Sequence, residues 1–168
     1  MVSSVLLTFA ACTPALGQQA EKAIIADQPD SPVTISSYSN GYGGGGMGPD
    51  SRVAHQVELK NTGDQEVVAV DLGFAMTTVF DEFLYVESGV IVDTLSVGGT
   101  RTERWTIAGD ELKTFHTGIA YVRQVRNADG TVWKADLSPV AKRVQNIVDG
   151  FEASQLKPRK ERDRSGRR

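Results

Sequence analysis

Alternation of apolar and polar residues is the clearest pattern along this chain. Across residues 52–60 every second residue is apolar or a histidine, which predicts a half-buried strand. The inward set is Val53, His55, Val57 and Leu59. The alternation resumes across residues 66–75, where the inward set is Val68, Val70, Leu72 and Phe74. Residues 61–64 have the composition of a turn, so the two strands are expected to form a hairpin.

A second hairpin is predicted across residues 117–136. A long strand with Ile119, Tyr121 and Val125 on one face is followed by the turn pair Asp129-Gly130. Gly130 is suited to a positive φ angle, and the return strand carries Trp133. The notable residues of this hairpin all have a structural explanation, so we expect it to organise the fold and not the chemistry.

Shorter apolar runs at 33–37, 77–86, 90–95 and 100–107 complete the pattern, with the run at 77–86 fitting a strand or a strand plus a turn. Strands at spacings of about 8–12 residues are typical of an antiparallel sandwich. We therefore expect a mainly β fold, an immunoglobulin-like β-sandwich of about seven strands within residues 32–136.

After the predicted strands, the spacing of apolar residues changes from every second residue to the spacing of a helix. Ser138 and Pro139 suit the start of a helix, as N-cap and first helical residue. The following apolar residues recur at helical spacing and predict one amphipathic helix across residues 138–155. They are Val140, Val144, Ile147, Val148 and Phe151. This stripe must be buried either on the sandwich, the more common outcome, or on a partner.

Residues 1–17 are predicted to be an export signal, with a short apolar stretch followed by small residues. Cleavage before Gln18 fits the small residues at 15–17, whereas Phe9-Ala10-Ala11-Cys12 resembles a bacterial lipobox that would place lipid on Cys12. A buried strand or helix start is the alternative interpretation. Residues 18–31 are polar and are expected to be a linker. The predicted location is extracytoplasmic: periplasmic, anchored as a lipoprotein, or secreted.

Charge divides the chain unequally. Residues 18–156 contain 11 basic and 19 acidic residues, a net charge of 11 − 19 = −8. Residues 157–168 contain 7 basic and 2 acidic residues, a net charge of +5. Residues 156–168 are expected to be a disordered basic tail, either solvated or contacting an anionic surface of lipid, glycan or nucleic acid. The contacting cations would be Lys157, Arg159, Lys160, Arg162, Arg164, Arg167 and Arg168.

The residue types of known catalytic and metal sites are sparse. Cys12 is the one cysteine, and His55 and His116 are the two histidines, without metal-ligand spacing. Asp81 and Glu82 are adjacent and diverge in an extended chain. We therefore predict no catalytic residues, no cofactor and no metal. The competing hypothesis is a ligand-binding or hydrolytic envelope protein that uses the glycine-rich loop from Gly41 to Gly48 and a histidine beside one of the two carboxylates.

The turns and strands also carry a family resemblance. Relevant segments are a turn at 61–63, a Val-x-Val strand at 68–70, Phe-Asp-x-Phe at 80–83, and Asp-Gly-Thr with a following Trp at 129–133. Together they resemble FxLYD-like and other immunoglobulin-like domains of the bacterial envelope, although Val86 stands where the FxLYD motif has Asp. The resemblance implies an extracytoplasmic β-sandwich without catalytic residues. The leading hypothesis is a non-enzymatic domain that binds a protein or an envelope component.

Overall fold

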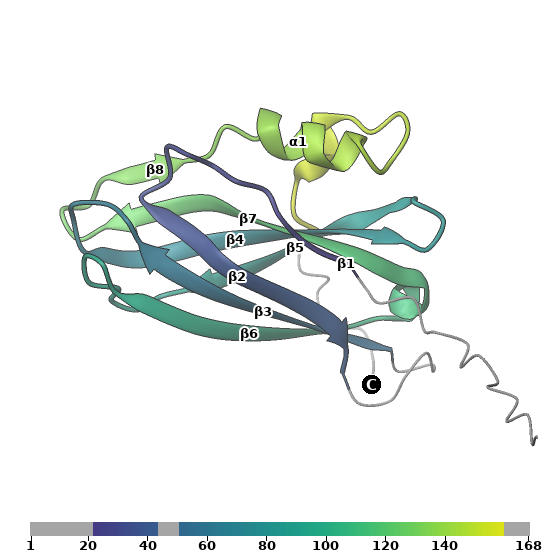
Figure 1. Cartoon of the computed structure of the whole chain (residues 1–168), viewed down its shortest axis with the longest axis horizontal. Coiled ribbons are helices and arrows are strands. Elements are labelled where there is room, and N and C mark those ends of the chain that lie inside the picture. The colour runs from purple at the N-terminus through teal and green to yellow at the C-terminus, as the bar shows by residue number, and fades with distance from the viewer. Residues whose placement is uncertain (1–21, 44–50, 160–168) are drawn as a thin grey trace, which may run out of the picture.

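The computed structural model describes residues 22–43 and 51–159, most of which lie in strands (Figure 1). The eight strands of this part of the chain are β1 (Lys22–Ile25), β2 (Val33–Tyr42), β3 (Arg52–Asn61), β4 (Val67–Thr78), β5 (Phe83–Ile91), β6 (Thr100–Ala108), β7 (Phe115–Asn127) and β8 (Val132–Lys134). The helical segments are η1 (Asp110–Thr114), α1 (Ser138–Gln145) and η2 (Ala153–Leu156). The fold is therefore mainly β, as the alternation predicted.

The strands form two sheets that face each other across an apolar core (Figure 1). One sheet has the order β1-β7-β4-β5, with β8 also paired to β7, and the other has the order β2-β3-β6. Only the β1–β7 pair is parallel among the strand pairs of the described residues. The core between the sheets includes Leu59 from β3, Leu72 and Phe74 from β4, and Val122 from β7.

The predicted hairpin of β3 and β4 is wrong. Each strand was located correctly, but β3 lies in the three-stranded sheet and β4 in the other. The buried Asn61 side chain accounts for the crossing, because its Nδ2 donates to the carbonyls of Gln65 (2.8 Å) and Leu95 (2.9 Å). The amide thus ties the β3–β4 connection to the β5–β6 connection. Turn composition located the bend but not the sheet that the chain enters next.

A bulge near the start of β4 corrects one predicted core position. The register with β7 shifts between Val67 and Ala69, so Val67 is fully buried and Val68 is only half-buried. From Leu72 onward β4 is buried on both faces, since α1 covers the face that points away from the three-stranded sheet. Strict alternation therefore underestimates how much of β4 is buried.

The hairpin of β7 and β8 forms with the predicted turn, but its predicted single face is wrong. Ile119 and Tyr121 pack under α1, whereas Val125 packs between the sheets, because the β4–β7 register shifts between Asp71 and Leu72. Gly130 has φ 90°, and Asp129 Oδ1 accepts hydrogen bonds from the backbone N–H (2.9 Å) and hydroxyl (2.7 Å) of Thr131. These bonds explain why Asp-Gly closes this turn. The same Thr131 hydrogen bonds hold the pKa of the Asp129 carboxyl below its usual range.

The C-terminal helix packs on the outer face of the β4–β5–β7 sheet (Figure 1). Val140 and Val144 are fully buried there against Ile119 and Tyr121, so the apolar stripe is buried within the chain itself. The helix is shorter than the predicted 138–155, ending at Gln145. Its N-cap position is Leu137 and not Ser138, and the carboxylate of Asp136 accepts the Ser138 N–H (2.9 Å) and hydroxyl (2.8 Å) instead.

The ends of the described chain are more ordered than the sequence predicted. Residues 22–25 of the predicted 18–31 linker form β1, which pairs with Thr117–Ala120 of β7. After β1 has ended, Gln28 Oε1 accepts the Val122 N–H (2.8 Å), so the Gln28 side chain pairs with the next part of the β7 edge. In the predicted disordered tail, Leu156 is 1% exposed and Pro158 bridges to Val86 of β5. Both segments carry apolar residues that pack in the core, Ile24 and Ala26 in the first and Leu156 in the second, within stretches that are otherwise polar.

Candidate functional site

The turn between β4 and β5, residues 79–82, is the best candidate for a functional site. Its conformation is fixed by the buried Thr78, whose hydroxyl accepts the N–H groups of Phe80 (3.1 Å) and Glu82 (3.2 Å). The Thr78 N–H donates to the carbonyl of Glu82 (2.9 Å), and its carbonyl accepts the Asp81 N–H (3.1 Å). One threonine therefore closes the whole turn.

This turn is also anchored to the rest of the domain. The Val79 N–H donates to the carbonyl of Thr114, the last residue of η1, at 2.9 Å. Asp81 has φ 58°, and it is the one non-glycine residue with positive φ in the described part of the chain. Aspartate adopts this region at some cost that glycine would avoid. A non-glycine residue held in this region is a reason to consider the turn as a candidate functional segment.

The turn presents two apolar side chains to solvent. Phe80 is 75% exposed and Val79 is 47% exposed. Single exposed apolar residues are common on protein surfaces, so exposure alone would be uninformative. Here, however, the two are adjacent and their backbone is held before any contact is made. Covering them would cost little ordering of the backbone, which favours binding.

The charges beside these residues are acidic. Asp81 and Glu82 are exposed and form no ion pair within the described residues. In the neighbouring η1, Asp110 Oδ1 lies 3.4 Å from Lys113 Nζ, and the Glu111 carboxylate is paired with the Arg159 guanidinium. The free carboxylates of the turn therefore border the apolar pair, and a complementary surface would be apolar with basic side chains around it.

His55 lies between the two sheets and is fully buried, in agreement with its predicted inward position on β3. Its ring stacks on Phe74 with centroids 4.7 Å apart, and its Nδ1 lies 2.7 Å from the hydroxyl of Tyr38. Asn40 Nδ2 donates to the Tyr38 hydroxyl (3.1 Å). The hydroxyl therefore donates to His55 Nδ1, which places the imidazole proton on Nε2. In the described structure Nε2 has no hydrogen-bond partner.

Burial controls the ionisation of this pair. Desolvation lowers the pKa of His55 to about 4 and raises the pKa of Tyr38 well above its usual range, although the Asn40 hydrogen bond opposes the latter. Both side chains are consequently neutral at pH 7. A neutral, enclosed imidazole packed on Phe74 contributes to the core and is not presented to a substrate.

The other residues of the ligand-binding hypothesis do not come together with His55. His116, at the start of β7, is half-buried and has its Nδ1 3.2 Å from the Thr117 hydroxyl. Neither histidine is hydrogen-bonded or ion-paired to Asp81 or Glu82. Of the glycine-rich loop, Gly41 lies in β2 and the segment 44–50 is outside the described residues.

Several predicted contact residues also lie outside the described residues: Cys12, Lys160, Arg162, Arg164, Arg167 and Arg168. Arg159 is described and is held by the domain itself. Its guanidinium pairs with Glu111 and lies 4.9 Å from the ring centroid of Tyr85, while its N–H donates to the Val86 carbonyl (3.0 Å). The structure therefore ties this cation to η1 and β5, whereas Lys157 is exposed.

Residues 22–43 and 51–159 contain no group of three or more His, Cys, Asp or Glu side chains able to hold a metal ion. The same residues contain no helix long and apolar enough to cross a membrane.

The sequence left the run at residues 77–86 open as a strand or a strand plus a turn, and the structure shows a turn at 79–82 between β4 and β5. The available signal was the Asp81-Glu82 pair, which interrupts that run after Val79 and Phe80. The sequence does not reveal that Thr78 is buried and that its hydroxyl closes the turn.

Comparison with known proteins adds little. No protein-family model and no curated protein sequence matches the chain. Among solved structures, a structural-genomics target called SoR45 is similar at 13% identity and a TM-score of 0.46, covering 62% of this chain and 80% of its own. The putative ApaA protein from Bordetella pertussis has 14% identity and a TM-score of 0.38, covering 61% and 85%. A hypothetical protein from Peptoclostridium difficile 630 has 12% identity and a TM-score of 0.41, covering 74% and 95%. Likenesses of this size carry no information about activity.

Proposed function

We propose that this chain is an exported, non-enzymatic binding domain that docks onto a partner protein of the cell envelope through its β4–β5 turn. The main support for this proposal is the exposure of Phe80, whose side chain is 75% exposed. It lies on a turn that the Thr78 hydroxyl closes and in which Asp81 has φ 58°. A turn selected for stability alone would favour glycine at 81 and polar side chains at 79 and 80.

The strand order supports an immunoglobulin-like assignment of the domain. The orders β2-β3-β6 and β5-β4-β7-β8 correspond to the A-B-E and C′-C-F-G arrangements of immunoglobulin-like sandwiches. The proposed FxLYD-like relationship rests on the sequence segments alone. Such domains bind through loops held by a rigid pair of sheets. Export rests on residues 1–17 of the sequence, with either cleavage before Gln18 or lipid on Cys12.

The chemistry of the turn defines the partner surface. Phe80 and Val79 require an apolar pocket, and the unpaired Asp81 and Glu82 require basic side chains at its edge. Fully burying a phenylalanine side chain is worth about 1.5–3 kcal/mol. Because Phe80 is already one-quarter covered, its burial would contribute about 1–2 kcal/mol, or about five- to thirtyfold in affinity.

Site-specific crosslinking tests this proposal. A photoreactive phenylalanine analogue replaces Phe80, and in a matched protein it replaces Val92, which is 81% exposed on the connection after β5. In envelope extracts of the native host, position 80 is expected to give one dominant protein adduct that excess wild-type domain abolishes and excess Phe80→Ser domain does not. Equal labelling from positions 80 and 92, or equal competition by both domains, would refute docking through the turn.

A further inference from the structure

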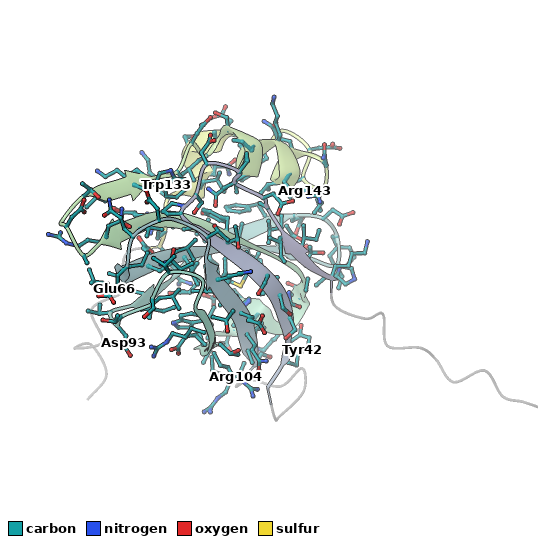
Figure 2. The ribbon with its side chains drawn as sticks, turned by 60° about the vertical axis from the view of Figure 1, so that its left-hand side comes forward. Tyr42, Glu66, Asp93, Arg104, Trp133 and Arg143 are labelled. Carbon is teal, nitrogen blue, oxygen red and sulfur yellow. The ribbon has the colours of Figure 1, made fainter. Side chains whose placement is uncertain are left out.

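A groove runs along α1, beside the segment of chain that follows β1. It has a volume of about 260 Å³ and lies between Ile25–Asp27 and the helix (the Arg143 side of α1 in Figure 2). The helix contributes Pro139, Lys142 and Arg143, and Asn146 follows directly after its last residue on the same side. The buried stripe of Val140 and Val144 lies on the neighbouring face, against the sheet.

The walls of the groove differ in charge. Lys142 and Arg143 are exposed and form no ion pair within the described residues, although Asp136, just before the helix, acts electrostatically on Lys142. Cations near a helix C-terminus are favoured by the helix dipole, which accounts for their presence in α1 but not for their position along a groove. The opposite wall carries Asp27, and between them lie the half-buried Ile25 and the buried Ala26.

We infer that this groove binds an extended acidic segment of a partner protein. Arginine and lysine pair with carboxylates, the arginine in a bidentate geometry, and Asn146 offers an amide donor beside them. Ile25 and Ala26, the apolar floor of the groove, would contact the aliphatic parts of the peptide's side chains. The volume suits a few residues of peptide, well below the space that a folded domain would occupy. This site is independent of the β4–β5 turn and stands whether or not the turn docks onto a protein.

The Asp27 carboxylate, on the opposite wall of the groove, provides the most discriminating test of the inference. A uniformly acidic ligand places carboxylates against Asp27 as well as against the two cations. Removing this one charge should therefore strengthen the binding of such a ligand, while removing an equal charge elsewhere should not. Asp64, which lies in the β3–β4 connection and is exposed, provides the matched position.

The test is a titration of the isotope-labelled protein with N-acetylated hexaglutamate amide, followed by amide NMR shifts at low salt. We expect shifts concentrated at residues 25–27 and 139–146, and an affinity at least tenfold lower for Lys142→Glu/Arg143→Glu. A control with the same charge change is Lys60→Glu/Arg104→Glu, on exposed positions of β3 and β6, and it should bind within twofold of wild type (Figure 2 labels Arg104 and Arg143 on opposite sides of the domain). Asp27→Asn should bind more tightly and Asp64→Asn should not.

Each alternative result overturns the inference. Absence of shifts, shifts spread over the surface, or equal loss in both double variants would show only general electrostatic attraction. Binding to vesicles of 30% phosphatidylserine that depends on Lys142 and Arg143, without binding to the peptide, would assign the groove to anionic lipid instead. Circular dichroism of each variant confirms that the exposed substitutions leave the fold intact.

Discussion

Acidification should destabilise this domain through His55. The imidazole is fully buried, stacks on Phe74 and has a pKa of about 4, against 6.5 for an ordinary histidine. Because the folded state lowers this pKa, the unfolded chain binds the proton first as pH falls below 6.5. Stability is therefore fully present above pH 6.5 and is lost progressively toward pH 4.

The magnitude follows from the two pKa values. At about 1.36 kcal/mol per pKa unit, the complete loss is about 3 kcal/mol, of which about 2 kcal/mol falls between pH 7 and pH 5. This is a large fraction of the stability of a typical domain. No charged side chain is hydrogen-bonded to the ring: Tyr38, its partner at Nδ1, is neutral because burial raises its pKa.

Urea unfolding at pH 7 and pH 5 measures the effect. Wild type should lose about 2 kcal/mol more of its unfolding free energy than His55→Gln, in which the side chain no longer titrates but can accept the Tyr38 hydrogen bond. His116→Gln is the control and should retain the wild-type dependence. The reasoning fails if His55→Gln and wild type lose equal stability, or if the NMR titration of His55 in the folded protein has its midpoint near 6.5.

Three further substitutions test the packing and the turn. Gly118→Ala should destabilise the domain by about 1–3 kcal/mol in urea unfolding, because the new methyl group would collide with the Tyr38 hydroxyl, whereas Gly43→Ala, with its nearest side-chain contact at 3.9 Å, should be nearly neutral. Asp81→Gly should raise the midpoint of thermal unfolding by relieving the positive φ, a gain of about 1 kcal/mol; an unchanged midpoint would argue that the turn is unstrained. Val144→Ala should cost about 2 kcal/mol if α1 is part of the core, and a loss below 0.5 kcal/mol, typical of surface sites, would contradict its packing on the sheet.

The local elements were predictable where side-chain pattern and backbone agree. The inward face of β3, the Asp129-Gly130 turn and the Val140–Val144 stripe follow from period and turn chemistry, and the structure contains all three. The crossing between sheets after Asn61 was not predictable, because it is accompanied by a hydrogen bond from the Asn61 amide to the carbonyl of Leu95, 34 positions away along the chain.

The candidate sites were less predictable than the strands. The β4–β5 turn is closed by local hydrogen bonds to the Thr78 hydroxyl, but the sequence does not show that this side chain is buried. Arg159 is ordered, unlike the predicted tail, because Glu111 and Tyr85 hold its guanidinium, and no local pattern encodes those distant contacts. The apolar residues of β1 did not reveal the strand because its partner, β7, lies far along the chain.

The most direct test of the proposed docking is the affinity of the Phe80→Ser domain for the protein crosslinked at position 80. Calorimetric titration of that purified protein should give a dissociation constant about five- to thirtyfold higher for Phe80→Ser than for wild type. Val92→Ser, which removes an equally exposed apolar side chain, should bind like wild type. Equal dissociation constants for wild type and Phe80→Ser would contradict docking through the β4–β5 turn.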